Sequence, residues 1–200
     1  MIKVVLFDIG GVIIKIPENR YYKYLSEVGS DSSRIAECII NKNGPQLESG
    51  AMSINRFNNI MSKELGIPKN KVGWLAFFKR FGKLNTAITG VITSLHKNYK
   101  IGFLSNVDKS RYTYALKHQM RPILYLFDYK FASFELGTVK PSHLIYIKVC
   151  RLINAKPSEV LFIDNNPDNV ISAKEVGMES LHFTTIRKLK LDLKHLGIDI

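Results

Sequence analysis

The stretch that decides the fold is VVLFD at residues 4–8, which is followed at once by Ile9, Gly10 and Gly11. Four consecutive apolar residues suit a short strand that is buried on both faces, as in a parallel sheet. The two glycines end the run and favour a tight loop at its carboxyl end. This stretch therefore predicts a central parallel strand that delivers Asp8 to a loop.

Strands and helices alternate through much of the remaining chain. We expect strands at 99–104, 131–132, 160–163 and 180–183, and helices at 110–118, 142–153, 167–176 and 186–196. This alternation predicts an α/β fold, in which helices cover both faces of a Rossmann-like parallel sheet.

The region 17–90 has a different pattern, in which helical periodicity dominates. Phe57, Met61 and Leu65 recur at helix spacing, and Gly66 then supplies a helix end. We expect about four short helices here, divided at the glycines Gly29, Gly44 and Gly66.

A helical insertion directly after the first strand predicts a cap over the carboxyl ends of the strands, where open α/β sheets bind ligands. We therefore expect an α/β core of residues 1–16 and 91–200, and a helical cap of residues 17–90. Trp74 is expected in the core of the last cap helix, with a place in the substrate cleft as the alternative.

The composition is that of a folded, water-soluble protein. Hydrophobic residues make up 46% and charged residues 23% of the 200 residues, which excludes disorder throughout. Asp8 interrupts the first apolar run, so we expect neither a signal peptide nor a membrane span. Cys38 and Cys150 lie far apart and predict buried thiols rather than a disulfide or a zinc site. A cytoplasmic protein is expected.

The net charge of +12 is compatible with nucleic acid, an anionic membrane surface or a small anionic ligand. Between residues 65 and 127, eleven basic residues, among them Arg80 and Arg111, accompany one acid, Asp108. We expect this segment to form a positive face. No aromatic-basic stacking pattern or helix-turn-helix accompanies it, so nucleic acid is not favoured as the partner.

Polar residues follow the predicted strands at the point where each one ends. They are Asp8, the pair Ser105 and Asn106, Lys140, and Asp164. Each alone is commonly a turn residue, a helix cap or a solvated charge. Together they place two carboxylates, one cation and one hydroxyl at the same end of one sheet.

This combination of groups suits phosphoryl transfer. Carboxylates are hard oxygen ligands, and Mg²⁺ typically takes one or two of them and keeps several waters. A lysine and a hydroxyl with neighbouring backbone N–H groups hold phosphate oxygens. An aspartate beside both is placed to accept a phosphoryl group as an aspartyl-phosphate.

Four segments in this order resemble the motifs of the haloacid dehalogenase superfamily. They are FDIGGVI at 7–13, LSN at 104–106, GTVKP at 137–141 and FIDNNPDNV at 162–170. The closest similarity is to phosphatases with a helical cap inserted after the first motif. The form F-D-x-G-x-V, together with LESG at 47–50, is similar to a subgroup that includes phosphatases acting on glucose 1-phosphate.

The resemblance implies Mg²⁺-dependent hydrolysis of small phosphomonoesters, with sugar phosphates as the expected class. It makes Asp8 the nucleophile and a Mg²⁺ ligand, with the Gly10 carbonyl and Asp164 as the other protein ligands. Lys140 is then catalytic, because it bridges the phosphate and Asp8. No nucleic acid or membrane partner is implied, and the oligomeric state stays open.

The same resemblance assigns supporting roles to four other residues. Ser105 and the Asn106 amide bind the phosphoryl oxygens, and Asn165 or Asp168 orients the metal shell. The family commonly has an acid at the position of Asn165, so we expect weaker Mg²⁺ binding here.

The second departure from the family is at Gly10, where a general acid usually stands. Positioned acid–base catalysis contributes about 10²–10⁴-fold, so its loss needs an explanation. The substrate can have a good leaving group, such as an anomeric or acyl phosphate, or Glu48 or Glu64 of the cap can supply the proton. The remaining alternative is a weak or inactive protein that binds phosphate ligands for regulation. Dehalogenation is not favoured, because Gly10, Gly11 and Asp164 do not suit it.

Overall fold

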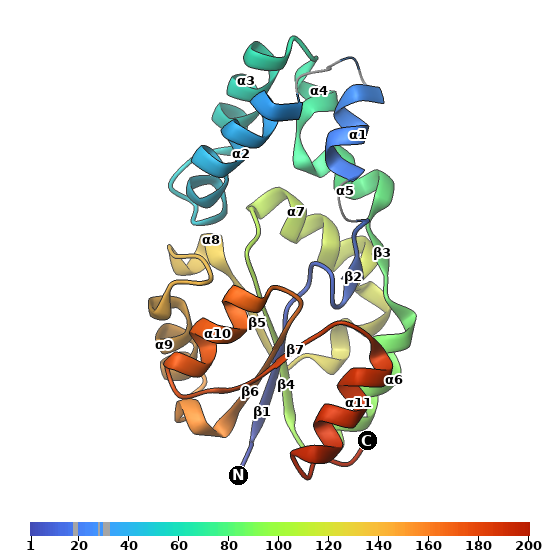
Figure 1. Cartoon of the computed structure of the whole chain (residues 1–200), viewed down its shortest axis with the longest axis vertical. Helices are drawn as coiled ribbons and strands as arrows, with labels where there is room; N and C mark the ends of the chain where they lie inside the picture. Colours follow the sequence, from blue (N-terminus) through green and yellow to red (C-terminus); the bar gives the residue numbers. More distant parts are fainter. Residues whose placement is uncertain (18–19, 28, 30–32) are drawn as a thin grey trace.

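Five parallel strands form the central sheet of the computed structural model, which describes residues 1–17, 20–27, 29 and 33–200. The strands lie in the order β5-β4-β1-β6-β7, with β1 in the centre. Their bounds are β1 Val4–Phe7, β4 Lys100–Ser105, β5 Tyr129–Ala132, β6 Val160–Asp164 and β7 Glu179–His182. The α/β fold with a parallel sheet is confirmed (Figure 1).

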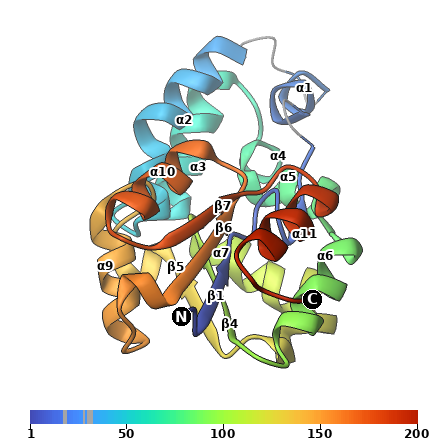
Figure 2. The same cartoon turned by 60° about the horizontal axis from the view of Figure 1, so that its bottom comes forward.

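Successive residues of each strand face opposite sides of the sheet, so β1 contributes to two separate cores. Val5 and Phe7 lie in one core cluster, whereas Val4 and Leu6 lie in the other. The first cluster is covered by α6 (Thr86–Leu95) and α11 (Ile186–His195), and the second by α9 (His143–Leu152) and α10 (Pro167–Glu175). Figure 2 shows these two helix pairs on opposite sides of the sheet.

Shorter elements complete this lobe. They are α7 (Lys109–Tyr114), the π-helix η1 (Ala115–Gln119), the 3₁₀-helices η2 (Arg121–Leu126) and η3 (Pro157–Glu159), and α8 (Ser133–Leu136). The helix expected over 110–118 is therefore α-helical in its first half, and its second half is the π-helix η1.

The helices that follow the first strand form a second lobe above the sheet (Figure 1). They are α1 (Arg20–Glu27), α2 (Ser33–Glu48), α3 (Ile54–Leu65), α4 (Lys69–Val72) and α5 (Trp74–Phe81). A third hydrophobic cluster joins them, with Phe57 and Met61 fully buried. Gly66 ends α3 in the left-handed conformation, as the sequence predicts.

The expectation that Gly44 divides two helices is wrong, because α2 continues through it. A Cβ atom at this position would lie 3.2 Å from Cη2 of Trp74. The glycine therefore serves close packing: it lets the backbone of α2 approach the Trp74 ring. A packing glycine and a helix-ending glycine look alike in the sequence.

The chain passes between the two lobes through β2 (Ile14–Lys15) and β3 (Lys83–Leu84). These two short strands pair antiparallel and so hold the entry and exit of the helical lobe together. Helix α6, which begins two residues after β3, packs in the first core cluster beside the sheet. The boundaries of the cap at residues 17 and 90 stay a prediction.

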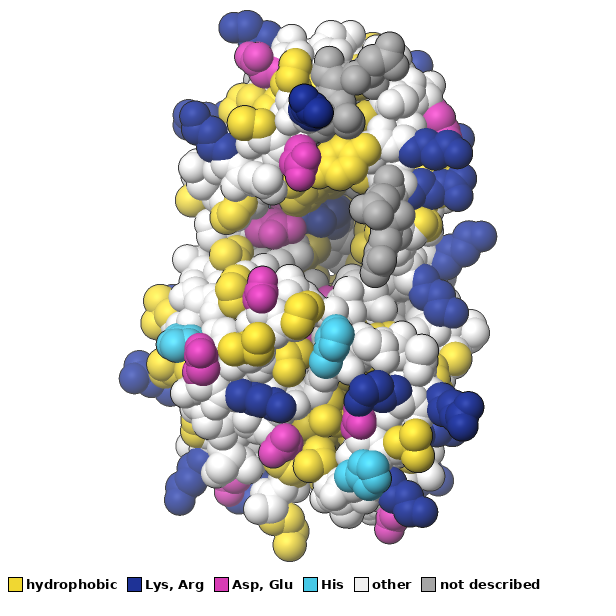
Figure 3. All heavy atoms as spheres, viewed as in Figure 1, with side chains coloured by type: hydrophobic (Ala, Val, Ile, Leu, Met, Phe, Trp, Pro, Cys, Tyr) yellow, Lys and Arg dark blue, Asp and Glu magenta, His cyan; other side chains and the backbone are white. Residues whose placement is uncertain are grey.

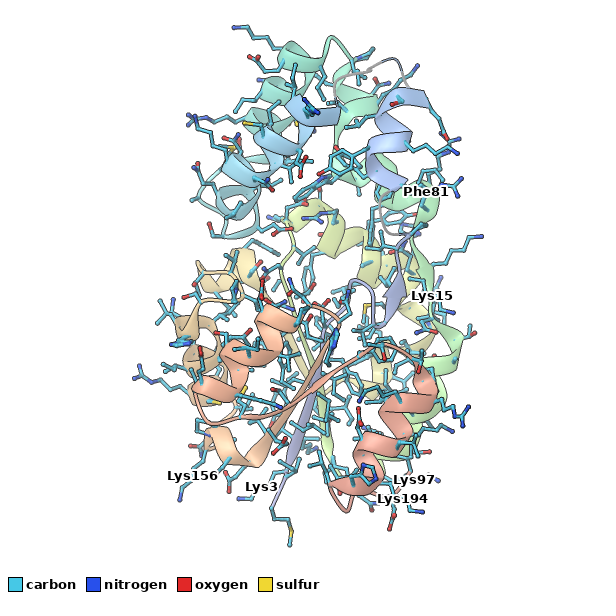
Figure 4. The ribbon with its side chains drawn as sticks, in the orientation of Figure 1. Lys3, Lys15, Phe81, Lys97, Lys156 and Lys194 are labelled. Carbon is cyan, nitrogen blue, oxygen red and sulfur yellow. The ribbon has the colours of Figure 1, made fainter. Side chains whose placement is uncertain are left out.

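The basic residues of segment 65–127 do not form one positive face. Lys97 lies at the end of the molecule opposite the helical lobe, as do Lys3, Lys156 and Lys194 (Figure 4). Arg80, in contrast, belongs to α5 and pairs with Glu27 of α1 at 3.3 Å. Arg111 is largely buried, with 14% of its side chain exposed.

Two further expectations concern cysteines and membranes. Cys150 is buried as expected. Cys38 is exposed, and the expectation that its thiol is buried is therefore wrong. Within the described residues, every helix is too short or too polar to cross a bilayer.

Candidate active site

The carboxyl ends of β1 and β6 bring Asp8 and Asp164 to one buried lysine. The ammonium of Lys140 donates to Oδ1 of Asp8 at 2.7 Å and to Oδ2 of Asp164 at 2.6 Å. It also donates to the carbonyl of Leu104 at 3.0 Å. These three bonds use all three donors of the ammonium group, so its position is fixed.

Asp8 is the most exposed member of this trio. Its side chain is 11% exposed, whereas those of Lys140 and Asp164 are 1% exposed. Burial raises the pKa of Asp8 from 3.8 to about 6, with Asp164 adding to the rise and Lys140 opposing it. Burial alone would lower the pKa of Lys140, but the two carboxylates outweigh it and raise that pKa. Lys140 is therefore a permanent cation beside both acids.

Asn106 holds the backbone that carries this lysine. Its side-chain Nδ2 donates to the carbonyl of Lys140 at 2.8 Å, and its Oδ1 accepts from the Lys140 N–H at 2.8 Å. Ser105 ends β4 and is 5% exposed. Both residues thus lie at the expected strand end, and their binding of phosphoryl oxygens stays a prediction.

Asp164 is held from a second side by the start of α10. Its Oδ1 accepts from the backbone N–H of Asn166 at 2.8 Å, and its Oδ2 accepts from Nδ2 of Asn169 at 3.0 Å. Asp168 is exposed, and its backbone N–H donates to Oδ1 of Asn166. The side-chain contact to Asp164 is thus made by Asn169, which sequence analysis does not single out. The role of Asp168 in orienting the metal shell stays a prediction. Asn166 is the N-cap of α10, so Asn169 lies in the first turn of this helix. That position is the only feature of the sequence that could have pointed to Asn169.

Asn165 lies against the first loop, and its role in orienting the metal shell stays a prediction. A Cβ atom at Gly11 would be 2.5 Å from Nδ2 of Asn165, and Gly11 has a φ of +82°. The second glycine of the opening motif is thus required both by its backbone conformation and by the close approach of Asn165. This contact joins the loop after β1 to the loop after β6.

Gly10 does not have a conformation that only glycine adopts. The φ angle of Gly10 is not in the positive range, whereas that of its neighbour Gly11 is. A Cβ atom at Gly10 would lie 3.6 Å from Cδ1 of Ile16 and 3.8 Å from Oδ2 of Asp8, which are ordinary contacts. The backbone at this position therefore accepts a side chain pointing toward Asp8.

A cavity of about 440 Å³ opens beside these loops. Gly10, Gly11 and Asn165 border it from the sheet, while Trp74 and Arg111 border it from the other side. Figure 3 shows the hollow between the two lobes, with hydrophobic, acidic and basic side chains gathered around it. Trp74 thus lines the cleft and also packs against the helical-lobe cluster, so both places considered for it from the sequence apply in part.

The sequence profile of a hydrolase family, described as haloacid dehalogenase-like hydrolase, matches residues 2–177. The match includes both carboxylates, the lysine and the helical lobe. This chain belongs to the haloacid dehalogenase-like hydrolase family. The expected superfamily is thereby confirmed, and the F-D-x-G-x-V subgroup stays a prediction.

Two relatives within this family extend over nearly the whole chain. D-ribitol-5-phosphate phosphatase of Bacteroides thetaiotaomicron is 27% identical over 190 residues, covering 90% of this chain and 91% of that protein. The sesquiterpene phosphatase of Aspergillus oryzae is 24% identical over 200 residues, covering 97% of this chain and 96% of that protein. Both relatives are named as phosphatases.

A solved structure of a haloacid dehalogenase family enzyme from Bacteroides thetaiotaomicron has the same fold. It is a complex with magnesium and inorganic phosphate, and it aligns with a TM-score of 0.81 at 21% identity. The alignment covers 92% of this chain and 95% of that one.

In this family member, a largely buried ion-pair network connects the helical lobe to α7 and to the residue that precedes it, Asp108. Nη2 of Arg111 donates to Oε1 of Glu48 at 2.8 Å, and Nε of Arg111 donates to Oδ2 of Asp108 at 2.5 Å. Ser133 adds a bond of 2.5 Å from its hydroxyl to the carbonyl of Glu48. The guanidinium also lies 4.4 Å from the centre of the Trp74 ring. Residues 48 and 111 are 63 positions apart, so no sequence pattern could have paired them.

The two candidates for a replacement proton donor lie in different places. Burial raises the pKa of Glu48, and Arg111 acts in the opposite direction. Glu64 is exposed on α3 and borders a separate cavity with Cys38 and Lys42. The structure therefore brings Glu48, but not Glu64, to the side of the helical lobe that contacts the sheet.

The donor set around Asp8 and Asp164 suits a divalent cation. Two buried carboxylates share one lysine, so the group has an excess of negative charge, and burial raises the pKa of Asp8 because that charge is poorly solvated. Mg²⁺ typically takes one or two carboxylates and keeps several waters, and two carboxylates lie together here. Within the described residues no three acidic, His or Cys side chains cluster as ligands. A protein ligand besides the two carboxylates would have to be a carbonyl, such as that of Gly10.

Proposed function

We propose that this chain is a Mg²⁺-dependent phosphatase that hydrolyses small phosphomonoesters through an aspartyl-phosphate on Asp8. The observation that carries the proposal is the buried trio, in which Lys140 contacts Asp8 and Asp164 and Asp8 is the most exposed of the three. The family match and the two relatives named as phosphatases support it.

In the first step, a carboxylate oxygen of Asp8 forms a bond to phosphorus and the bond to the leaving oxygen breaks. The leaving oxygen takes up a proton as the alcohol departs. In the second step, water attacks the phosphorus, Asp8 leaves as the carboxylate, and inorganic phosphate is released. Lys140 keeps its charge beside Asp8 throughout and stabilises the negative charge on the transferring group.

The Ser105 hydroxyl and the Asn106 N–H are proposed to hold the phosphoryl oxygens, since both lie at the end of β4 next to Asp8 on β1. Asp8, Asp164 and the Gly10 carbonyl are proposed to hold Mg²⁺. When bound, Mg²⁺ neutralises charge on the phosphoryl oxygens. Asn169 holds Asp164 for this role through its bond of 3.0 Å.

The test is a turnover screen over sugar, polyol, nucleotide, acyl and apolar alkyl phosphates, with Mg²⁺ and with excess chelator. Turnover that depends on Mg²⁺ supports the proposal. Tight binding of inorganic phosphate with no turnover of any substrate would favour the phosphate-binding alternative that Gly10 leaves open.

Added Mg²⁺ should raise the melting temperature, and this rise should shrink as pH falls through about 6. In the metal-free protein the pKa of Asp8 is raised from 3.8 to about 6, so the folded state binds the proton more tightly than the unfolded state. This carboxyl therefore contributes stability at low pH that is lost as pH rises through about 6. Mg²⁺ needs the ionised form and must displace that proton below this pH.

The measurement is differential scanning fluorimetry with Mg²⁺ or chelator at a series of pH values on both sides of 6. The Asp8→Asn variant is the control, because it has no proton to displace and should show no pH dependence of this kind. A Mg²⁺ effect of equal size at every pH in the unmodified chain would contradict the assignment of Asp8 as a ligand.

Gly10→Asp should supply the missing proton donor without backbone strain. The position has an ordinary φ, and its Cβ would make only van der Waals contacts with Ile16 and Asp8. In the unmodified chain we expect rates on aryl phosphates to fall steeply as the pKa of the leaving group rises. The variant should flatten this dependence and raise turnover of the poorest leaving groups by about 10²-fold or more.

Gly11→Asp is the matched control, because its side chain would clash with Asn165 and its φ of +82° is unfavourable for other residues. It should lower the melting temperature and not restore turnover. A flat leaving-group series in the unmodified chain would mean that another group already donates the proton, and Glu48→Gln would then be the variant to measure.

A further inference from the structure

The cavity beside the catalytic loops is the place for the alcohol part of the substrate, if Asp8 acts as proposed above. Gly10 and Gly11 follow Asp8 directly, and Asn165 follows Asp164. A phosphoryl group at Asp8 therefore has its leaving oxygen beside this cavity of about 440 Å³. Its lining determines which alcohols are accepted.

The wall formed by the helical lobe consists largely of aromatic rings. These are Tyr21, Tyr22, Trp74, Phe77 and Phe78. Several of them hold each other in position: the ring of Tyr21 lies 5.1 Å from that of Phe77 and 6.4 Å from that of Trp74, both edge to face. Ile16 and Ile40 add aliphatic surface. The cavity thus offers broad apolar contact area.

Two of the polar side chains that line the same cavity are held by other parts of the protein. The hydroxyl of Tyr21 donates to the carbonyl of Val72 at 2.8 Å. The guanidinium of Arg111 is held by Asp108 and Glu48, and it stacks on Trp74. Within the described part of the chain, the Tyr22 hydroxyl, the Trp74 indole N–H, Nη1 of Arg111 and the Asn165 amide make no side-chain hydrogen bond.

A polyol has a hydroxyl on each carbon, and each one loses its water when it enters such a cavity. Hydroxyls that lie against the ring wall would find no partner there, and every buried unpaired polar group weakens binding. An apolar alcohol loses nothing in this way and gains contact with the rings. We propose that the preferred substrate is the phosphomonoester of an apolar, ring-bearing alcohol rather than of a sugar or polyol.

The decisive experiment compares two primary alkyl phosphates, so that the leaving oxygen is of the same type in both. With 2-phenylethyl phosphate and ribitol 5-phosphate, kcat/KM should favour the phenylethyl ester by about tenfold or more, the effect of one or two aromatic contacts. Tyr22→Ala should reduce kcat/KM for the phenylethyl ester by about fivefold, mainly through KM, because it removes one ring. Ribitol 5-phosphate should lose less than the phenylethyl ester, because the only partner that it can lose is the Tyr22 hydroxyl.

Tyr125→Ala is the matched control, because Tyr125 is a 77% exposed ring on η2 that does not border the cavity. It should change neither value. A preference for ribitol 5-phosphate, or an equal loss for both esters in Tyr22→Ala, would overturn the inference and leave the phosphatase proposal intact.

A second readout separates this inference from the proposed function. The chain contains a single tryptophan, Trp74, so tryptophan fluorescence reports on this cavity alone. The non-hydrolysable 2-phenylethylphosphonate should change the emission at concentrations where ribitol 5-phosphonate does not. If this emission change occurs but no phosphate is turned over, the phosphatase proposal is rejected and the preference of the cavity for apolar groups is retained. If phosphates are turned over but neither phosphonate changes the emission, the preference for apolar groups is rejected.

Discussion

Asp8→Asn should reduce phosphatase turnover by about 10⁴-fold or more, the scale of losing a catalytic nucleophile. The substitution keeps the shape of the side chain but removes the negative charge that attacks phosphorus. The fold should persist, because Lys140 retains its bond of 2.6 Å to Asp164 and its bond to the Leu104 carbonyl. The measurement is kcat under saturating substrate, with a thermal melt of the same preparation.

Asp199→Asn is a suitable control, since it makes the same chemical change on an exposed residue near the end of the chain. Its turnover should equal that of the unmodified protein. Beryllofluoride with Mg²⁺ should also load Asp8 as an acyl-phosphate mimic, and the Asp8→Asn variant should not be loaded. Substantial turnover in Asp8→Asn would reject the covalent mechanism.

Lys140→Met should cost about 3–5 kcal/mol of folding free energy, which is typical of breaking a buried ion pair from one side. Methionine fills a similar volume but leaves Asp8 and Asp164 together without their shared cation. Turnover should fall as well, because the charge that stabilises the transferring phosphoryl group is gone. Urea unfolding followed by circular dichroism measures the stability.

Two comparisons make this result specific. Lys97→Met, on an exposed lysine far from the site, should change stability by less than about 0.5 kcal/mol. Mg²⁺ should restore part of the stability of Lys140→Met, since a divalent cation would again neutralise the two carboxylates, but should not restore turnover. If Lys140→Met lowers the free energy of unfolding by less than about 1 kcal/mol, the ion pairs behave as solvent-exposed ones. That result would contradict the burial of Lys140, whose side chain is 1% exposed.

The sequence carried enough information for the sheet and for the parts of the site that stand at strand ends. VVLF at 4–7 is apolar on both faces, and only a central parallel strand buries it on both sides, so the position of Asp8 followed. Asp164 follows from the same logic on β6. Their meeting at Lys140 also depends on the loop after α8, which brings the lysine to both carboxylates.

Local sequence signals failed where a residue's role depends on a distant partner. Gly44 alone indicates a helix end, but the Trp74 ring, thirty positions later, makes it a packing glycine. A segment with eleven basic residues predicts that Arg111 belongs to a positive surface, and nothing local indicates that Glu48 and Asp108 pair with it. Whether a basic side chain lies on the surface or in an ion pair depends on the acids that the fold brings next to it. For Arg111, one of these acids comes from the other lobe.

The sequence by itself determined the α/β fold, the inserted helices and the family, because hydrophobic periodicity and ordered polar motifs are local properties of the chain. Only the tertiary structure decided that Asn169 supports Asp164, that Gly10 has room for a side chain, and that the rings of α1 and α5 face the catalytic loops. The physical reason is that substrate contacts arise between elements, where distance, burial and competing hydrogen bonds exist only after the two lobes have come together.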